Sequence, residues 1–114
     1  MEKNKKENII IENAKGEKEI IPTSKIRYLE ADRRRLKVII GDGKNHYIKE
    51  KISDFEKKLE QYYGFIRVGR SYIINIFHVD HWERRGLVIE GKYISISASR
   101  YKDFEKEIER IMNL

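Results

Sequence analysis

The chain of 114 residues contains no cysteine. This absence excludes a disulfide framework, a zinc site built on thiolates and a cysteine nucleophile. It also fits a reducing cytosol, where disulfides rarely persist. Proline occurs once, at Pro22. Because proline cannot donate a hydrogen bond to a strand ladder, we expect a strand to end there.

Long apolar runs are missing as well. No stretch approaches the roughly 20 apolar residues of a membrane-spanning helix. Residues 1–8 are polar and charged, so they lack the apolar core of a secretory signal peptide. We therefore expect a cytoplasmic protein without membrane association. Its length suits one domain rather than two, which we place at residues 9–114 after a flexible N-terminus at 1–8.

The usual marks of catalysis are absent too. The sequence has no phosphate-binding glycine loop, no Ser-His-Asp order and no pair of carboxylates placed for acid–base work. His78 and His81, with Asp80 between them, raise the question of a metal site. In a strand, however, the two imidazoles would point to opposite faces, and a third ligand is not evident. We expect no enzymatic activity, no cofactor and no metal.

Basic residues are in excess. Lys and Arg number 25 against 19 Asp and Glu, which gives a net charge of +6. A polyanionic partner such as nucleic acid is therefore a reasonable expectation. The acidic residues concentrate in the segments that we predict as helices. The arginines instead cluster where we predict turns: Arg33–Arg35, Arg67 with Arg70, Arg84–Arg85, and Arg100.

The hydrophobic pattern predicts a mainly β, antiparallel fold with nine or ten short strands, one internal helix and one C-terminal helix. We expect strands at 9–12, 17–21, 26–31, 36–40, 46–49, 65–68, 72–74, 79–83, 87–90 and 93–97. Asp42-Gly43 predicts a tight turn. In the strand at 26–31, Ile26, Tyr28 and Glu30 should share one face.

Helical spacing of apolar residues predicts helices at 52–63 and 99–112. Ser53 and Glu56 suit a capping box at the start of the first helix, and Gly64 suits its end. Both helices have Glu-rich polar faces, which phosphates would repel, and the pattern contains no helix-turn-helix. If the domain binds DNA, the turns between strands must do so.

The most informative stretch runs from Gly64 to Asn75 and reads Gly-Phe-Ile-Arg-Val-Gly-Arg-Ser-Tyr-Ile-Ile-Asn. It predicts two short strands that meet at a basic corner formed by Gly69, Arg70 and Ser71. Glycine permits a tight backbone at a corner, and Arg and Ser contact phosphates and base edges. We read Asn75 as a structural residue that caps the backbone. Arg67 fits an internal pair with a glutamate as well as a phosphate contact.

This stretch resembles the signature of the LytTR DNA-binding family, the output domains of bacterial transcription regulators. Family members have a Gly-Phe-Ile-Arg-Val-His-Arg-Ser-Tyr-Ile-Val-Asn-like run. The chain departs from it at Gly69, where the family often has histidine or a small polar residue, and at Ile74, where valine is usual. The matching residues are Phe65, Ile66, Arg67, Val68, Arg70, Ser71, Tyr72, Ile73 and Asn75. The Ile26–Ala31 segment also resembles a second hallmark of the family, and the resemblance spans about residues 9–101.

The resemblance implies that loops between strands, rather than a helix, enter successive grooves of double-stranded DNA. Carried over to this chain, it implies three groups of DNA-binding residues. The second and third groups are the basic corner and the start of the last helix, where hydroxyls and a helix N-terminus suit phosphate. The three groups are Arg33, Arg34 and Arg35; Gly69, Arg70 and Ser71; and Ser97, Ser99, Arg100 and Lys102.

The resemblance also implies partners. We expect control of transcription at paired promoter sites, with a homodimer on the DNA. Most such regulators belong to two-component systems and carry an N-terminal receiver domain with a phosphorylated aspartate. No receiver domain is present in these 114 residues.

Two other functions fit the same sequence. Gly69 and Ala98 both lack polar reach, which suits a module that kept the fold but binds a protein partner instead of DNA. A β-surface with exposed tyrosines would suit single-stranded nucleic acid, although tyrosines such as Tyr28 and Tyr72 are more often core residues.

Overall fold

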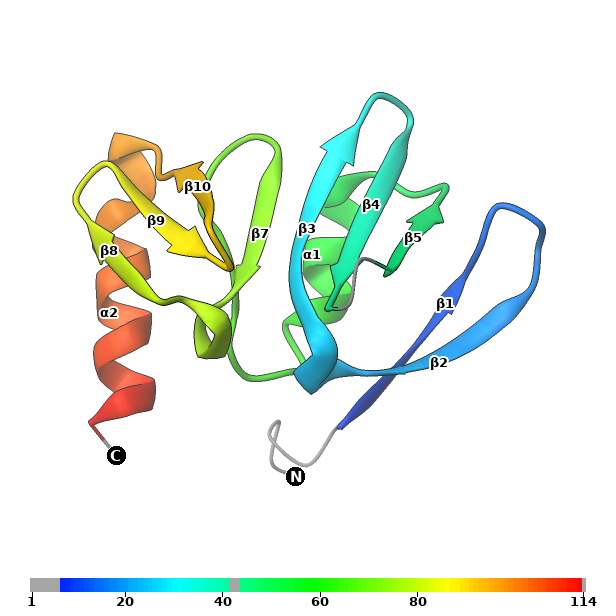
Figure 1. Cartoon of the computed structure of the whole chain (residues 1–114), viewed down its shortest axis with the longest axis horizontal. Coiled ribbons are helices and arrows are strands. Elements are labelled where there is room, and N and C mark those ends of the chain that lie inside the picture. Colours follow the sequence, from blue (N-terminus) through cyan, green and yellow to red (C-terminus); the bar gives the residue numbers. More distant parts are fainter. Residues whose placement is uncertain (1–6, 42–43, 114) are drawn as a thin grey trace.

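The computed structural model describes residues 7–41 and 44–113, so the predicted turn at Asp42-Gly43 lies outside the described residues. Within these ranges, ten strands form three antiparallel sheets, accompanied by two α-helices (Figure 1). The mainly β, antiparallel architecture predicted from the sequence is therefore confirmed. The strands are β1 (Asn8–Glu12), β2 (Lys18–Pro22), β3 (Ile26–Asp32), β4 (Arg35–Ile40), β5 (Lys44–Ile48), β6 (Phe65–Arg67), β7 (Tyr72–Asn75), β8 (His81–Glu83), β9 (Gly86–Ile89) and β10 (Lys92–Ser95). The helices are α1 (Ile52–Leu59) and α2 (Tyr101–Met112).

A five-stranded sheet in the order β5-β4-β3-β7-β6 forms the centre of the molecule. Successive residues of these strands point to opposite faces, and both faces are covered. Ile73 of β7, for example, belongs to one core and the next residue, Ile74, to the other. The sheet therefore separates two hydrophobic cores.

The first core lies between the central sheet, helix α1 and the β1–β2 hairpin. Leu36, Val38 and Ile40 of β4 are buried, as the alternation in the sequence predicts. Phe55 and Leu59 of α1 cover them, together with apolar residues of the hairpin. The hairpin begins at Asn8, one residue before the predicted domain boundary, and its second strand ends at Pro22.

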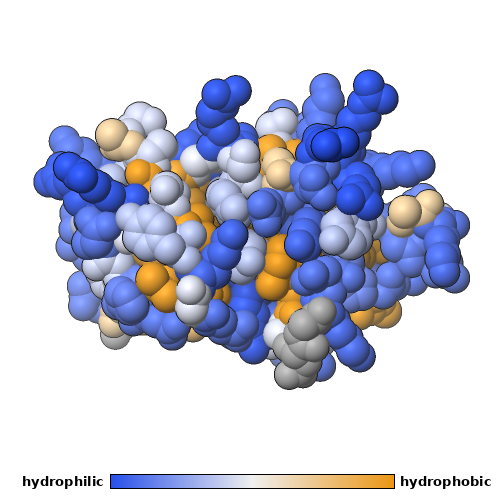
Figure 2. Space-filling model, turned by 45° about the horizontal axis from the view of Figure 1, so that its top comes forward, coloured by the Kyte–Doolittle hydropathy of each residue, from blue (hydrophilic) through white to orange (hydrophobic). Residues whose placement is uncertain are grey.

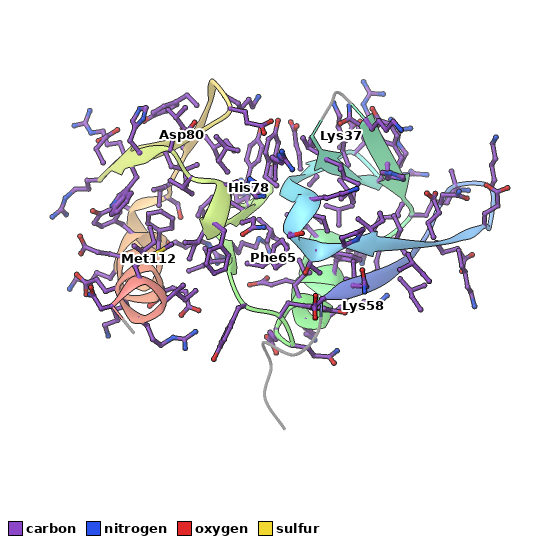
Figure 3. All side chains as sticks on the ribbon, turned by 60° about the horizontal axis from the view of Figure 1, so that its bottom comes forward. Lys37, Lys58, Phe65, His78, Asp80 and Met112 are labelled. Carbon is purple, nitrogen blue, oxygen red and sulfur yellow. The ribbon has the colours of Figure 1, made fainter. Side chains whose placement is uncertain are left out.

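The second core lies on the opposite face, beneath the β10-β9-β8 sheet and helix α2. Its centre is Phe104, which contacts Trp82 edge-on with ring centroids 6.1 Å apart. Phe104 and Ile108 are the buried members of the stripe predicted for the terminal helix. Seen from below, Phe65 and His78 lie between the two halves of the molecule, and Met112 marks the end of α2 (Figure 3).

The prediction that Ile26 shares a face of β3 with Tyr28 and Glu30 is wrong for Ile26. The register with β4 shifts between Ile26 and Tyr28, so that Arg27 is an extra residue in a β-bulge. Ile26 therefore shares the first core with Leu29, while Tyr28 packs against the second core. Strict alternation cannot anticipate a bulge, because the inserted residue reverses the faces that follow.

The first helix is shorter than predicted, and its capping box is absent. Lys51 is the N-cap residue, and no side chain caps the helix. The helix starts at Ile52, which packs against the first core, so Ser53 lies inside the first turn. Gly64 lies five residues beyond Leu59, in the left-handed region with φ = 96°. A Cβ at Gly64 would come within 2.8 Å of the Phe77 ring, so this turn requires glycine.

Candidate nucleic-acid interface

Four turns that are far apart in the sequence lie along one edge of the molecule. In Figure 1 the β3–β4 turn, the loop into β7, the β8–β9 turn and the loop from β10 to α2 all lie along the upper edge. We call this surface the basic edge. It consists of Arg33, Arg34, Arg70, Ser71, Arg84, Arg85, Ser97, Ser99, Arg100 and Lys102.

Backbone hydrogen bonds join these turns to one another. The amide of Ala31, at the end of β3, donates to the carbonyl oxygen of Ser71 over 2.8 Å. The amide of Ser97 donates to Val68 and that of Ile96 to Arg85, each also over 2.8 Å. The basic edge is therefore a single connected surface, because each turn is held directly against the next.

The first predicted group divides into two parts. Arg33 and Arg34 form the two-residue turn between β3 and β4 and are exposed, with Arg33 in the left-handed region (φ = 59°). Arg35 belongs to β4 instead. Its guanidinium pairs with Asp32 over 3.1 Å and lies 4.2 Å from the centre of the Tyr47 ring. We therefore leave Arg35 out of the basic edge.

The second predicted group is the corner between β6 and β7. Arg70 and Ser71 are exposed there, as a contact surface requires. Gly69 does not adopt a left-handed backbone, and the nearest atom to a Cβ at this position would be the Ser95 carbonyl oxygen at 4.0 Å. Glycine permits the corner, as the sequence suggests, but the corner does not require it, since a Cβ has room there.

The third predicted group surrounds the start of α2. One turn of 3-10 helix, Ala98–Arg100, precedes α2, and the amide of Arg100 donates to Ser97 over 2.9 Å. Ser97, Ser99 and Lys102 are exposed, and Arg100 is half-buried. Asp103 lies in the first turn of α2, so a negative charge accompanies the basic and hydroxyl groups at this helix terminus.

Arg84 and Arg85 are a fourth basic element that the sequence-based site lacks. They form the exposed turn between β8 and β9. The Arg84 guanidinium lies 5.5 Å from the centre of the Tyr101 ring, at the start of α2. The Arg85 amide donates to Glu83 over 2.9 Å and is the main reason that the pKa of this carboxyl is lowered. The arginine pair is visible in the sequence, but its place beside the other turns is not.

In the part of the chain that the structure describes, the arginines of the basic edge have no carboxylate partner. Within residues 7–41 and 44–113, salt bridges hold the guanidinium groups of Arg27, Arg35, Arg67 and Arg110. Across the same ranges, Arg33, Arg34, Arg70, Arg84, Arg85 and Arg100 have no carboxylate oxygen within 4.0 Å. Figure 2, with the upper edge turned forward, shows strongly hydrophilic side chains projecting at its ends and middle. Unpaired guanidinium groups are available to bind phosphate or base edges.

Other residues of the signature stretch support this edge from inside. Asn75 is buried, donates from Nδ2 to the Ile26 carbonyl over 2.9 Å and accepts from the Phe77 amide at Oδ1 over 3.0 Å. The structural role predicted for Asn75 is confirmed. Tyr28 and Tyr72 pack against the second core. Burial, more than any charge, raises the pKa of both tyrosines.

The structure adds two further observations. In the described ranges, no cluster of three or more His, Cys, Asp or Glu side chains is arranged to hold a metal ion. His78 instead makes a short contact of 2.6 Å between Nε2 and the Ser24 carbonyl oxygen.

None of the helices in the described part of the chain is long and apolar enough to cross a membrane.

The structure is thus a β-rich domain with exposed basic turns gathered along one edge. Comparison with known proteins identifies the family of this domain. Residues 16–109 match the model of the LytTr DNA-binding domain, so the chain belongs to this family of DNA-binding domains. No curated protein matches the chain in sequence.

One similar solved structure comes from Bacillus cereus. It is described as the LytTr DNA-binding domain of a methyl-accepting/DNA response regulator. The two chains share 25% sequence identity with a TM-score of 0.69, and the match covers 90% of this chain and 97% of the other. The family resemblance carried by residues 64–75 is thus confirmed over most of the chain.

Proposed function

We propose that this domain recognises specific sequences in double-stranded DNA and thereby regulates transcription, with the turns of the basic edge inserted into DNA grooves. The observation that supports this most is the gathering of four basic turns from distant parts of the sequence on one edge. A structural requirement of the fold does not explain it, because the arginines of these turns form no salt bridge within residues 7–41 and 44–113, and all of them except the half-buried Arg100 are exposed.

The placement of the basic edge suits duplex DNA. The edge follows the direction of the long axis of the molecule and stops at the β3–β4 turn, beyond which lies the β1–β2 hairpin (Figure 1). Turns that lie in a row along one edge can reach successive grooves of the same duplex. Both helices would remain outside the grooves, which suits their glutamate-rich faces.

Within this proposal the side chains have different tasks. Arg70 and Arg100 flank the middle of the edge, and an arginine can bind guanine through two hydrogen bonds in the major groove. Ser71, Ser97, Ser99 and Lys102 have the short or flexible polar groups that usually bind phosphate. Arg33, Arg34, Arg84 and Arg85 would extend the contacts outward to the flanking backbone.

The setting of this activity is part of the proposal. The relative from Bacillus cereus belongs to a response regulator, and we propose that this chain likewise serves as an output domain in the cytoplasm. Two copies would occupy paired sites on the promoter. A receiver domain would have to act from outside these 114 residues.

The test is selection of binding sites from a random pool of duplex DNA at low salt. We expect one motif to be enriched with the unaltered chain. Arg70→Ala and Arg100→Ala should each weaken binding to that motif by about tenfold, the cost of one lost base contact. Arg110→Ala is the matched control, because it removes the same charge from a residue that pairs with Glu107 near the end of α2, and it should bind as the unaltered chain does.

Three results would contradict the proposal. One is unchanged duplex affinity in both Arg70→Ala and Arg100→Ala. Another is equal or better competition by single-stranded DNA, which would favour single-strand binding instead. If duplex DNA is not retained even at low salt while one protein is captured in stoichiometric amount, the chain is a protein-interaction module on the same fold.

A further inference from the structure

Arg67 lies directly behind the corner that presents Arg70 and Ser71, and its guanidinium contacts three acceptors. Nε donates to the carbonyl oxygen of Gly69 over 2.9 Å, and Nη2 donates to that of Arg70 over 2.8 Å. Nη1 donates to Oε1 of Glu56 over 3.1 Å. The side chain is only 14% exposed, so it does not reach outward as a DNA-contacting arginine would.

The corner depends on these bonds for its shape. The corner is closed at its base by the amide of Val68, which donates to Tyr72 over 3.1 Å. Beyond that base, no backbone amide of the described residues donates to the carbonyls of Gly69 or Arg70, so the Arg67 guanidinium supplies their hydrogen bonds. Gly69 adds no side chain that could restrict the loop.

Helix α1 holds the guanidinium from the other side. Glu56 lies on α1, which covers the opposite core from α2, and it forms a salt bridge with Arg67. The charged guanidinium donates to a carboxylate on one side and to two backbone carbonyls on the other. Such charged hydrogen bonds hold a side chain more firmly than those of a neutral donor. The contacts from Glu56 to Arg67, and from Arg67 to the corner, therefore connect the first core to the basic edge.

We infer that Arg67 is a positioning residue for DNA recognition: it fixes the backbone of residues 69–70 so that Arg70 and Ser71 project from the basic edge. This inference rests on the proposed DNA binding. A planar guanidinium can bind two carbonyls and a carboxylate at once, whereas a lysine ammonium is a single point donor on a flexible stem. Arg67 acts through the corner and does not itself bind phosphate.

The first experiment compares Arg67→Lys with Arg70→Ala on the selected duplex over a range of salt concentrations. Arg67→Lys keeps the charge, so we expect about fivefold to tenfold weaker binding, from a misplaced base contact, with an unchanged salt dependence. Arg70→Ala should weaken binding too, through the lost base contact. Lys102→Ala, which removes a proposed phosphate contact, should instead reduce the slope of log K against log salt by about one. In the free protein, the amide NMR signals of residues 69–71 should shift in Arg67→Lys.

A second pair of variants tests the link to α1 by the sign of the effect. Removing a negative charge normally tightens DNA binding through electrostatics. Glu56→Ala should instead weaken it, by about threefold, because the Arg67 guanidinium loses its anchor. Glu60→Ala is the control, since this exposed residue at the end of the same helix does not contact Arg67, and it should bind equally well or more tightly.

The outcomes separate the inference from the function on which it rests. Absence of duplex binding by the unaltered chain would overturn the proposed function. Binding by the unaltered chain, with Arg67→Lys equal to it or with a salt slope reduced as in Lys102→Ala, would overturn the positioning role alone. Tighter binding by Glu56→Ala would overturn the positioning role as well.

Discussion

At the scale of single residues, Asn75 shows how the signature stretch supports the fold. It is the one fully polar side chain that is buried in the described ranges, with 2% of its surface exposed. Its amide connects β7 to the start of β3 and to the segment that follows β7. A buried polar group is stable only with its hydrogen bonds made, so both partners depend on this side chain.

We predict that Asn75→Ala lowers the free energy of unfolding by about 2–3 kcal/mol, because a buried carbonyl and an amide lose their partner. Urea unfolding followed by circular dichroism measures this loss. Asn113→Ala, at an exposed position after α2, is the control and should change stability little. A loss below about 0.5 kcal/mol for Asn75→Ala, the level of a typical surface change, would show that water replaces the lost bonds.

The sequence predicts single residues well where one local interaction decides their role. The cap made by Asn75 follows from its place at the end of a strand. Arg67 could be interpreted in two ways, and only the fold shows that Glu56, eleven positions earlier in the chain, lies within reach. Arg35 was misplaced in the turn for a related reason, since its partners Asp32 and Tyr47 come together only in the sheet.

At the scale of elements, strand alternation and turn residues predict most of the fold. Hairpins such as β1–β2 and β8–β9 follow from short alternating runs around Gly16 and Gly86. The bulge at Arg27 and the early end of α1 do not follow, because packing on two cores decides both. The meeting of four turns on one edge depends on the strand order, which local pattern does not determine.

The β1–β2 hairpin offers a test of which of its faces is buried. Ile11 is buried in the first core with 3% of its surface exposed, whereas its neighbour Ile10 is 63% exposed and lies opposite the exposed Ile20. Ile11→Ala should therefore cost about 2–4 kcal/mol of unfolding free energy. Ile10→Ala should cost less than about 1 kcal/mol, mainly through lower strand propensity. Urea unfolding compares the two directly, and equal costs would mean that the hairpin is packed differently.

At the scale of the whole molecule, hydrophobic packing and positive charge lie on different surfaces. The central sheet uses both faces for hydrophobic cores, so the sheet faces are not available for a large partner. Helix α2 starts at the basic edge and extends away from it (Figure 1), so that only Asp103, in its first turn, brings a negative charge close to the edge from the described part of this helix. Among the described residues, arginines from several elements that form no salt bridge come together at these turns.

The central claim is that duplex DNA binds along the basic edge, and an NMR titration of the isotope-labelled chain with the selected duplex tests it most directly. The account predicts that amide signals shift at residues 33–34, 69–71, 84–85 and 97–102. Signals of the β1–β2 hairpin and of the last turn of α2 should stay in place. Shifts concentrated on the hairpin or on α1, with those four turns unaffected, would contradict the account.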